Sequence, residues 1–278
     1  MLRIVRIILI ILFCLALLCA AGLYFYTYTH EDASPPVFRS GTDLLEVSVT
    51  DPDDALLQEL WANDNADGDL SSRIRVKDVS GLINETDVNV TYIVFDEASN
   101  YATYTRTVRY RDYTPPRFNL LRPMIFNVGE TVSFGSSVTV TDLRDGNISG
   151  RLKLEESTVI SNTPGTYSAV LSATNRMGDS ITLPLTVQII DNSTTRPEIT
   201  LDKYLIYVSL GAEPNWKDYL VQITDPLSES EDKTVSLRKI TINASRVDVS
   251  TPGVYEVYYY YTGISGEIAT VILTVIVE

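Results

Sequence analysis

The sequence predicts an all-β protein, with three tandem immunoglobulin-like β-sandwiches behind one N-terminal transmembrane helix. Short runs of alternating apolar and polar residues predict strands with one buried and one wet face. Turn residues that recur at a nearly constant period predict that one sandwich plan is repeated. An apolar stretch without Asp, Glu, Lys or Arg, residues 7–30, predicts the helix.

The N-terminal segment has the length and charge pattern of a membrane anchor. Residues 7–26 supply the roughly 20 apolar positions that a helix needs to cross a bilayer core. Arg3 and Arg6 precede them, so the positive-inside rule places the N-terminus in the cytoplasm and the later domains outside the cell membrane. Two alternatives stay open: a cleaved signal peptide with a small-residue site at residues 19–21, and a lipoprotein signal, which Leu18 disfavours.

Composition narrows the classes of function. The net charge of −14 makes nucleic acid an unsuitable partner, because phosphate binding needs clustered Lys and Arg. Both cysteines, Cys14 and Cys19, lie in the apolar run, and the one histidine, His30, ends it. The predicted sandwiches therefore have no disulfide framework, no Cys or His metal site and no Cys or His catalytic group. We expect a protein that is not an enzyme.

Three proline-marked segments begin the repeats. Pro36, Pro116 and Pro197 stand 80 and 81 positions apart, and the first two follow another proline. Proline restricts both itself and the residue before it to extended geometry, so these sites suit short, stiff connectors. We therefore expect residues 1–33 to form the stub and anchor, and residues 34–113, 114–194 and 195–278 to form the three sandwiches.

Turns and strands inside the repeats recur as well. Asp67-Gly68 and Asp145-Gly146 provide turn chemistry in the first two copies, and the third copy lacks this pair. Thr-Pro-Gly turns at residues 163–165 and 251–253 lead into late strands that alternate apolar and polar side chains. One short helical segment, residues 55–61, is expected to cover a sandwich.

Taken in order, these signals resemble bacterial immunoglobulin-like modules, including the hyalin-repeat-like domains of surface proteins. The resemblance covers residues 34–278 and rests on the Pro-Pro, Asp-Gly-Asp-Leu-Ser, Thr-Pro-Gly-Thr-Tyr and Asp-Glu-Ala-Ser-Asn segments. It implies a sandwich fold, and it implies stalk, spacer or adhesive roles alike.

One acidic loop suggests a calcium site. Asn63, Asn65, Asp67 and Asp69 follow the alternating oxygen spacing of the first half of a calcium loop, with Gly68 at the turn. The twelfth position is Ile74 rather than Glu, and the second copy keeps the turn without the ligands. Calcium is the one cofactor that the sequence suggests, and a plain turn is the competing interpretation.

Tyrosines gather in the third copy. Tyr258 and Tyr260 are expected on the outer face of a late strand, with Tyr204 and Tyr207 elsewhere in the same copy. An exposed tyrosine offers a flat apolar face with a polar tip, which suits a sugar ring or a protein partner. The competing interpretation is that tyrosine is common in strands.

These features favour a single-pass protein of the cell envelope that binds polysaccharide or a surface protein. A structural spacer or assembly subunit of a membrane complex is the first alternative, and a calcium-dependent surface module is the second.

Overall fold

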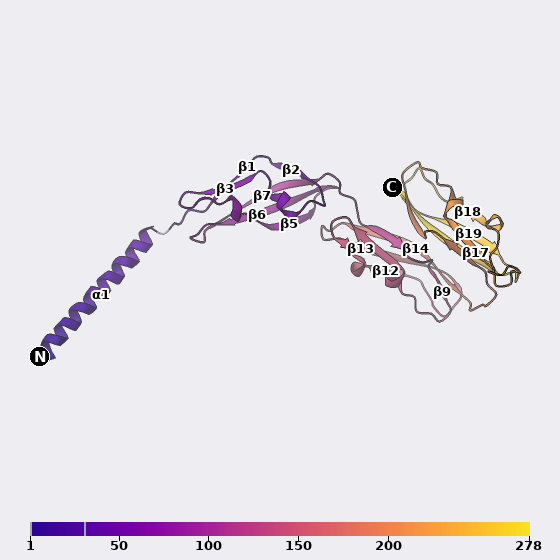
Figure 1. Cartoon of the computed structure of the whole chain (residues 1–278), viewed down its shortest axis with the longest axis horizontal. Helices are drawn as coiled ribbons and strands as arrows, with labels where there is room; N and C mark the ends of the chain where they lie inside the picture. The colour runs from indigo at the N-terminus through magenta and orange to yellow at the C-terminus, as the bar shows by residue number, and fades with distance from the viewer. Residues whose placement is uncertain (1, 31) are drawn as a thin grey trace. The chain divides into compact units, whose positions relative to one another are not determined.

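The computed structural model describes residues 2–30 and 32–278. The chain divides into two compact units, Met1–Arg111 and Asp112–Glu278. Within the described residues the one α-helix is α1 (Leu2–His30), and strands dominate both units (Figure 1). The prediction of an all-β protein after one N-terminal helix is therefore confirmed.

Helix α1 contains the apolar segment Arg6–Tyr26, which has 21 residues and a mean hydropathy of 2.9. This segment is long and apolar enough to cross a membrane, and an N-terminal signal sequence has the same character.

Unit 1 carries the first sandwich. One sheet has the spatial order β1 (Val37–Ser40), β3 (Leu60–Asp64) and β4 (Gly68–Asp69), and the other has the order β2 (Leu44–Val47), β7 (Tyr101–Tyr110), β6 (Asp87–Phe95) and β5 (Arg75–Leu82). Along β6, every second side chain is fully buried, which confirms the alternation expected there. Ala62 of β3 and Val108 of β7 are equally buried, so both sheets contribute to the interior.

Unit 2 carries the second and third copies. In the second copy, one sheet has the spatial order β11 (Gly146–Asn147), β10 (Val138–Asp142) and β8 (Arg117–Leu120). The other sheet has the order β12 (Lys153–Ser157), β13 (Gly165–Thr174), β14 (Ser180–Ile190) and β9 (Ile125–Asn127). In the third copy, one sheet pairs β15 (Glu198–Leu201) with β17 (Leu220–Thr224). The other sheet has the order β16 (Leu205–Val208), β20 (Ile268–Val277), β19 (Gly253–Thr262) and β18 (Thr241–Asn243). Each copy has its own hydrophobic core. The boundary expected between residues 194 and 195 lies inside this unit and stays a prediction.

The three copies repeat one topology. In each copy an early strand pairs parallel with the last strand: β2 with β7, β9 with β14, and β16 with β20. Gly68 and Gly146 have φ values of 74° and 70°, the left-handed conformation that the Asp-Gly turns require. The third copy, which lacks Asp-Gly, has an isolated bridge between Thr224 and Thr234 at the corresponding loop.

Short 3-10 turns connect strands in each of the three sandwiches. The segment expected to be helical over residues 55–61 is instead a 3-10 turn over Asp53–Leu57, followed by strand β3 from Leu60. Leu60 and Trp61 pair with strand β1 instead of continuing a helix, so the helical expectation was wrong for these residues. The Tyr92 hydroxyl donates a hydrogen bond to the Leu56 carbonyl at 2.7 Å and ties this turn to the core.

Candidate functional site

The second and third sandwiches of unit 2 pack against each other. Leu205 of β16 belongs to the buried core of the second sandwich, and Ile276 of β20 packs against the same core. At one end of this contact, the Phe118 amide donates a hydrogen bond to the Tyr207 hydroxyl at 2.8 Å. The Arg117 guanidinium lies 4.3 Å from the centre of the Tyr207 ring and pairs with the carboxylate of Glu278.

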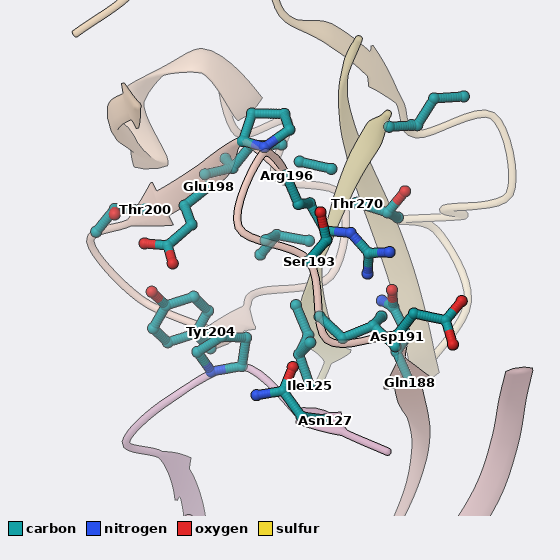
Figure 2. Close-up of a pocket in the computed structure, with 17 residues that line it drawn as sticks. Ile125, Asn127, Gln188, Asp191, Ser193, Arg196, Glu198, Thr200, Tyr204 and Thr270 are labelled. Carbon is teal, nitrogen blue, oxygen red and sulfur yellow. The ribbon is translucent and has the colours of Figure 1, made fainter. Parts of the chain in front are cut away.

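A cleft of about 460 Å³ opens between these two sandwiches (Figure 2). Such a volume falls in the range of small-molecule sites. Most labelled side chains around it in Figure 2 are polar: Asn127, Gln188, Asp191, Ser193, Arg196, Glu198, Thr200, Tyr204 and Thr270. Tyr204 is the aromatic residue of its lining.

Arg196 is the cationic group of this cleft. Its Nε is buried without a hydrogen-bond partner in the described part of the chain, and it lies 3.8 Å from the Glu267 carboxylate. Glu267 also accepts hydrogen bonds from the hydroxyls of Thr195 and Ser193, at 2.7 and 2.9 Å, and these bonds hold its pKa below the ordinary value. The carboxylate therefore stays ionised beside Arg196.

A second polar surface lies on the outer face of β19. Tyr258 and Tyr260 point away from the core, because they alternate with buried Val257, Tyr259 and Tyr261. The rings of Tyr258 and Tyr260 stack, with centroids 6.0 Å apart and planes 6° from parallel. We call these two residues the tyrosine pair.

Charged and amide side chains flank the tyrosine pair. Asn243, Arg246 and Glu256 line a pocket of about 160 Å³ with the two rings. The Tyr258 hydroxyl donates a 2.5 Å hydrogen bond to Glu256. Burial and this neighbouring carboxylate raise the pKa of Tyr258 to about 12, so the phenol keeps its proton at neutral pH.

The surface beside the tyrosine pair continues toward the second sandwich. A groove of about 320 Å³ joins Arg246, Glu256 and Tyr258 to outward residues of β13 and β14, among them Val170 and Pro184. Two strands from one sandwich and one strand from the next therefore border a single elongated depression. Such a depression can follow a chain-like ligand better than a compact one.

The four tyrosines expected to bind lie at three different places. Tyr258 and Tyr260 form the pair, Tyr204 lines the cleft, and Tyr207 occupies the contact between the sandwiches. Burial raises the pKa of Tyr207. Sequence reasoning did not single out Arg246 or Glu256, although Glu256 follows the same alternation as the tyrosine pair.

The four residues expected to bind calcium each have hydrogen-bond partners within unit 1. The amides of Asn63 and Asn65 donate to the Asp64 carbonyl and the Ser34 hydroxyl, at 3.1 and 3.4 Å. The Asp67 carboxylate accepts the Glu97 amide at 2.6 Å. Ser71 donates to Asp69 from its hydroxyl and its amide, at 2.5 and 2.9 Å, and thereby lowers the pKa of Asp69. Calcium binding by this set stays a prediction.

The chain matches no family model and no curated protein sequence. Among solved structures, it is similar to the M60 catalytic domain with the CBM51-1 and CBM51-2 domains of Clostridium perfringens ZmpB (13% identity, TM-score 0.24), covering 88% of this chain and 31% of that one. It is also similar to the protocadherin GammaB4 extracellular domain (15% identity, TM-score 0.22), covering 88% and 50%. Drosophila N-cadherin EC1-4 is a third (13% identity, TM-score 0.23), covering 89% and 76%. The chain thus spans a third to a half of the first two, and likenesses this low carry no argument about function.

Proposed function

We propose that this chain is a membrane-anchored surface protein that binds a neutral polysaccharide through the tyrosine pair, without catalysing a reaction. The observation that carries the proposal is the parallel stacking of Tyr258 and Tyr260 beside Arg246 and Glu256. Aromatic faces cover the apolar faces of sugar rings, and the flanking carboxylate, guanidinium and amide can pair with sugar hydroxyls.

Membrane attachment is the second part of the proposal. The apolar segment Arg6–Tyr26 anchors the chain, and Arg3 and Arg6 keep the N-terminus in the cytoplasm. Both sandwich units then lie outside the cell membrane, where polysaccharide is available. Retention of residues 1–30 in the mature protein, measured by mass spectrometry of the membrane fraction, supports the anchor against a cleaved signal.

The charge of the chain favours a neutral ligand. The net charge of −14 repels polyanions, and the surface around the tyrosine pair offers one guanidinium against one carboxylate. The elongated groove beside the pair fits a polymer.

The test is binding of the full chain, in detergent, to insoluble neutral polysaccharides, with chitin and cellulose as probes and polygalacturonate as the anionic comparison. We expect the Tyr258→Ala/Tyr260→Ala variant to bind the neutral probe at least about tenfold more weakly, a loss of about 1.4 kcal/mol. The matched control is Phe95→Ala/Tyr101→Ala, which removes an exposed aromatic pair of unit 1 with ring centroids 5.6 Å apart.

Unchanged binding by the Tyr258→Ala/Tyr260→Ala variant would refute the tyrosine pair as the site. Preference for polygalacturonate would refute the neutral ligand. Retention of surface proteins without retention on any polysaccharide would replace the glycan by a protein partner.

A further inference from the structure

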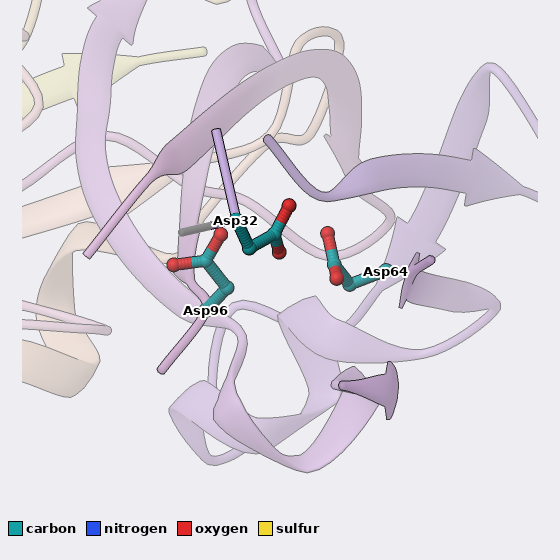
Figure 3. Close-up of side chains that lie close together, drawn as sticks. All are labelled: Asp32, Asp64 and Asp96. Atoms are coloured by element: carbon teal, nitrogen blue, oxygen red, sulfur yellow. The ribbon is translucent and has the colours of Figure 1, made fainter. Parts of the chain in front are cut away.

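Three carboxylates of unit 1 converge although they stand far apart in the sequence. One oxygen each from Asp32, Asp64 and Asp96 lies within 4.8 Å of the others (Figure 3). Asp64 ends β3, Asp96 directly follows β6, and Asp32 belongs to the segment between α1 and β1. Asp64 and Asp96 are only 3% and 6% exposed.

Backbone amides, and for Asp96 also a side-chain amide, hold each carboxylate in place. One oxygen of Asp64 accepts hydrogen bonds from two amides of the turn that follows it, at 2.8 and 3.1 Å. One oxygen of Asp32 accepts the Ser34 amide at 3.0 Å. Asp96 accepts the backbone and side-chain amides of Asn100, at 2.7 and 2.8 Å. The three side chains are therefore fixed before any ligand arrives.

Two oxygens of the cluster are buried and unpaired. Oδ2 of Asp64 and Oδ2 of Asp32 lack a hydrogen-bond partner within the described residues. A buried carboxylate oxygen without a partner is costly, and the cost rises when other carboxylates lie beside it. Figure 3 shows the three carboxyl groups turned toward one another, so the unpaired oxygens face a common space.

The second copy shows how the same position is satisfied without a cation. Asp142 ends β10 and binds its own turn through the same two amide contacts, at 2.9 and 2.7 Å. Asn175 occupies the place of Asp96, because each closes an equivalent hairpin onto the residue four positions later. The Asn175 side-chain amide donates to the second oxygen of Asp142 at 3.0 Å and to the Tyr113 hydroxyl at 2.9 Å.

In the third copy, other donors form hydrogen bonds to the carboxylate at this position. Asp225 follows β17, and Gly263 takes the hairpin position. The second oxygen of Asp225 accepts the Ile264 amide at 2.8 Å and the Tyr261 hydroxyl at 3.3 Å. Both copies of unit 2 therefore supply neutral donors where the first copy supplies two more carboxylates.

We propose that Asp32, Asp64 and Asp96 bind one divalent metal ion, with calcium as the best match. An all-oxygen, carboxylate-rich ligand set selects a hard cation. Calcium bonds of about 2.3–2.6 Å place ligand oxygens up to about 5 Å apart across the ion, which accommodates the observed spacing. Backbone carbonyls and water would complete the coordination.

The ion would also fasten the segment that follows the membrane helix. Asp32 is the ligand contributed by that segment, and its carbonyl already accepts the Asn100 side-chain amide at 2.9 Å. Metal binding adds a link between residue 32 and the ends of β3 and β6, where Asp64 and Asp96 lie. Calcium would therefore protect residues 32–36 from proteolysis.

The experiment is calcium titration of the full chain in detergent by calorimetry, with the melting temperature of unit 1 as a second readout. We expect one site with a Kd between about 10⁻⁵ and 10⁻³ M. At a hundredfold excess over Kd, the melting temperature should rise by roughly 10–20 °C. Magnesium should bind more weakly.

The decisive variant is Asp96→Asn, which installs the residue type that the second copy uses and so should fold. It should lose calcium binding at least tenfold and lose the protection of residues 32–36. Asp43→Asn is the matched control, because it removes one exposed carboxylate of unit 1 outside the cluster. Asp69→Asn tests the neighbouring acidic loop and should retain binding.

Three results would overturn the proposal. The first is no calcium response of the wild-type chain at about 10 mM. The second is wild-type binding by Asp96→Asn. The third is loss of binding in Asp69→Asn, which would move the ion into the loop. Equal or stronger binding of magnesium would overturn calcium as the ion.

Discussion

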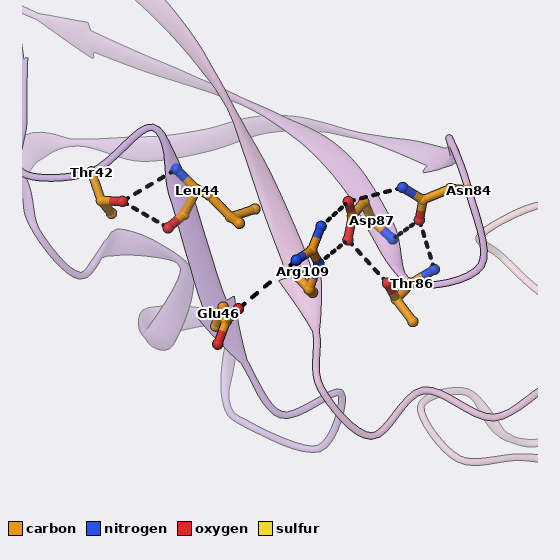
Figure 4. Close-up of polar contacts among 7 residues, drawn as sticks. All are labelled: Thr42, Leu44, Glu46, Asn84, Thr86, Asp87 and Arg109. Atoms are coloured by element: carbon orange, nitrogen blue, oxygen red, sulfur yellow. Dashed lines mark hydrogen bonds and ion pairs between the residues drawn. The ribbon is translucent and has the colours of Figure 1, made fainter.

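The first sandwich and the third sandwich pair their strands in the same register but place opposite chemistry at matching positions. Asp87 lies opposite Arg109 in the first sandwich, and Val254 lies opposite Ile276 in the third. The Asp87–Arg109 ion pair measures 2.8 Å (Figure 4), whereas Val254 and Ile276 pack against the core of the second sandwich. The matching outward cross-strand pair is therefore charged in the first sandwich and apolar in the third, where it contacts the second sandwich.

The interiors of the first and third sandwiches also differ between polar and apolar side chains. Arg106 of β7 is 3% exposed and donates to the carbonyls of Leu56 and Gln58, at 2.9 and 2.6 Å. Leu273 takes the matching position of β20 in the third sandwich, where it is fully buried. At this position the first sandwich has a buried polar network, and the third has a buried apolar side chain.

The largest expected effect tests the apolar contact within unit 2. Leu205 and Leu44 occupy matching positions, opposite Thr274 and Thr107 in the parallel strand pairs. Leu205 lies buried in the second core, while Leu44 is half-buried. Leu205→Ala should lower the free energy of unfolding of unit 2 by about 3 kcal/mol. Leu44→Ala should cost unit 1 less than about 1 kcal/mol. Urea denaturation monitored by hydrogen exchange measures the free energy of unfolding of each unit separately. Equal losses of stability in Leu205→Ala and Leu44→Ala would contradict the contact between the second and third sandwiches.

Strand alternation and turn chemistry were predictable from the sequence because they are local. The period of two marked the buried side chains of β6, β13 and β19, and Asp-Gly marked the left-handed turns. The association of the second and third sandwiches was not predictable. Leu205 reads as an ordinary strand residue, because alternation identifies a face and not the neighbour that covers it.

The carboxylate cluster escaped sequence reasoning for a related reason. Spacing within one loop suggested the set at residues 63–69, since local spacing can only reveal ligands on a single segment. Asp32, Asp64 and Asp96 come from three segments, and β3 and β6 belong to different sheets, so only the folded sandwich brings the three carboxylates together. Comparison of the hairpin residues Asp96 and Asn175 could have shown that the first copy has a carboxylate where the second has a donor amide.

A smaller effect should separate the two interiors. The Tyr259 hydroxyl donates one hydrogen bond to the Trp216 carbonyl at 2.7 Å, so Tyr259→Phe should cost unit 2 about 1 kcal/mol. The Tyr92 hydroxyl donates to Leu56 and also accepts Arg106 Nε at 3.1 Å. Tyr92→Phe leaves a buried charged donor unpaired, so it should cost unit 1 about 2 kcal/mol. Thermal unfolding measures both losses.

The exposed Tyr101 provides the control, and Tyr101→Phe should change the stability of unit 1 by less than about 0.5 kcal/mol. Equal losses for Tyr92→Phe and Tyr259→Phe would show that Arg106 gains nothing from the tyrosine hydroxyl. The contrast between a polar and an apolar interior would then rest on Arg106 alone.

The smallest expected effect concerns the ion pair of the outer face. Asp87 is buried and also accepts hydrogen bonds from Asn84 and Thr86, at 2.9 and 3.0 Å (Figure 4). Arg109 is 43% exposed, so solvent screens the pair. Asp87→Asn should therefore cost unit 1 only about 1 kcal/mol at pH 7. Asp78→Asn, an exposed acidic change in β5, is the control.

The pH dependence of that loss identifies its cause. The hydrogen bonds from Arg109 and Asn84 hold the pKa of Asp87 well below its ordinary value. The ionised carboxylate is the stabilising form, so its contribution is complete above the unfolded pKa of about 4 and is lost as pH falls through the lower folded pKa. The stability difference between wild type and Asp87→Asn should hold from pH 7 to 5 and shrink below pH 4. A difference that stays constant into acid would assign the loss to packing, and the charged face would no longer distinguish the first sandwich from the third.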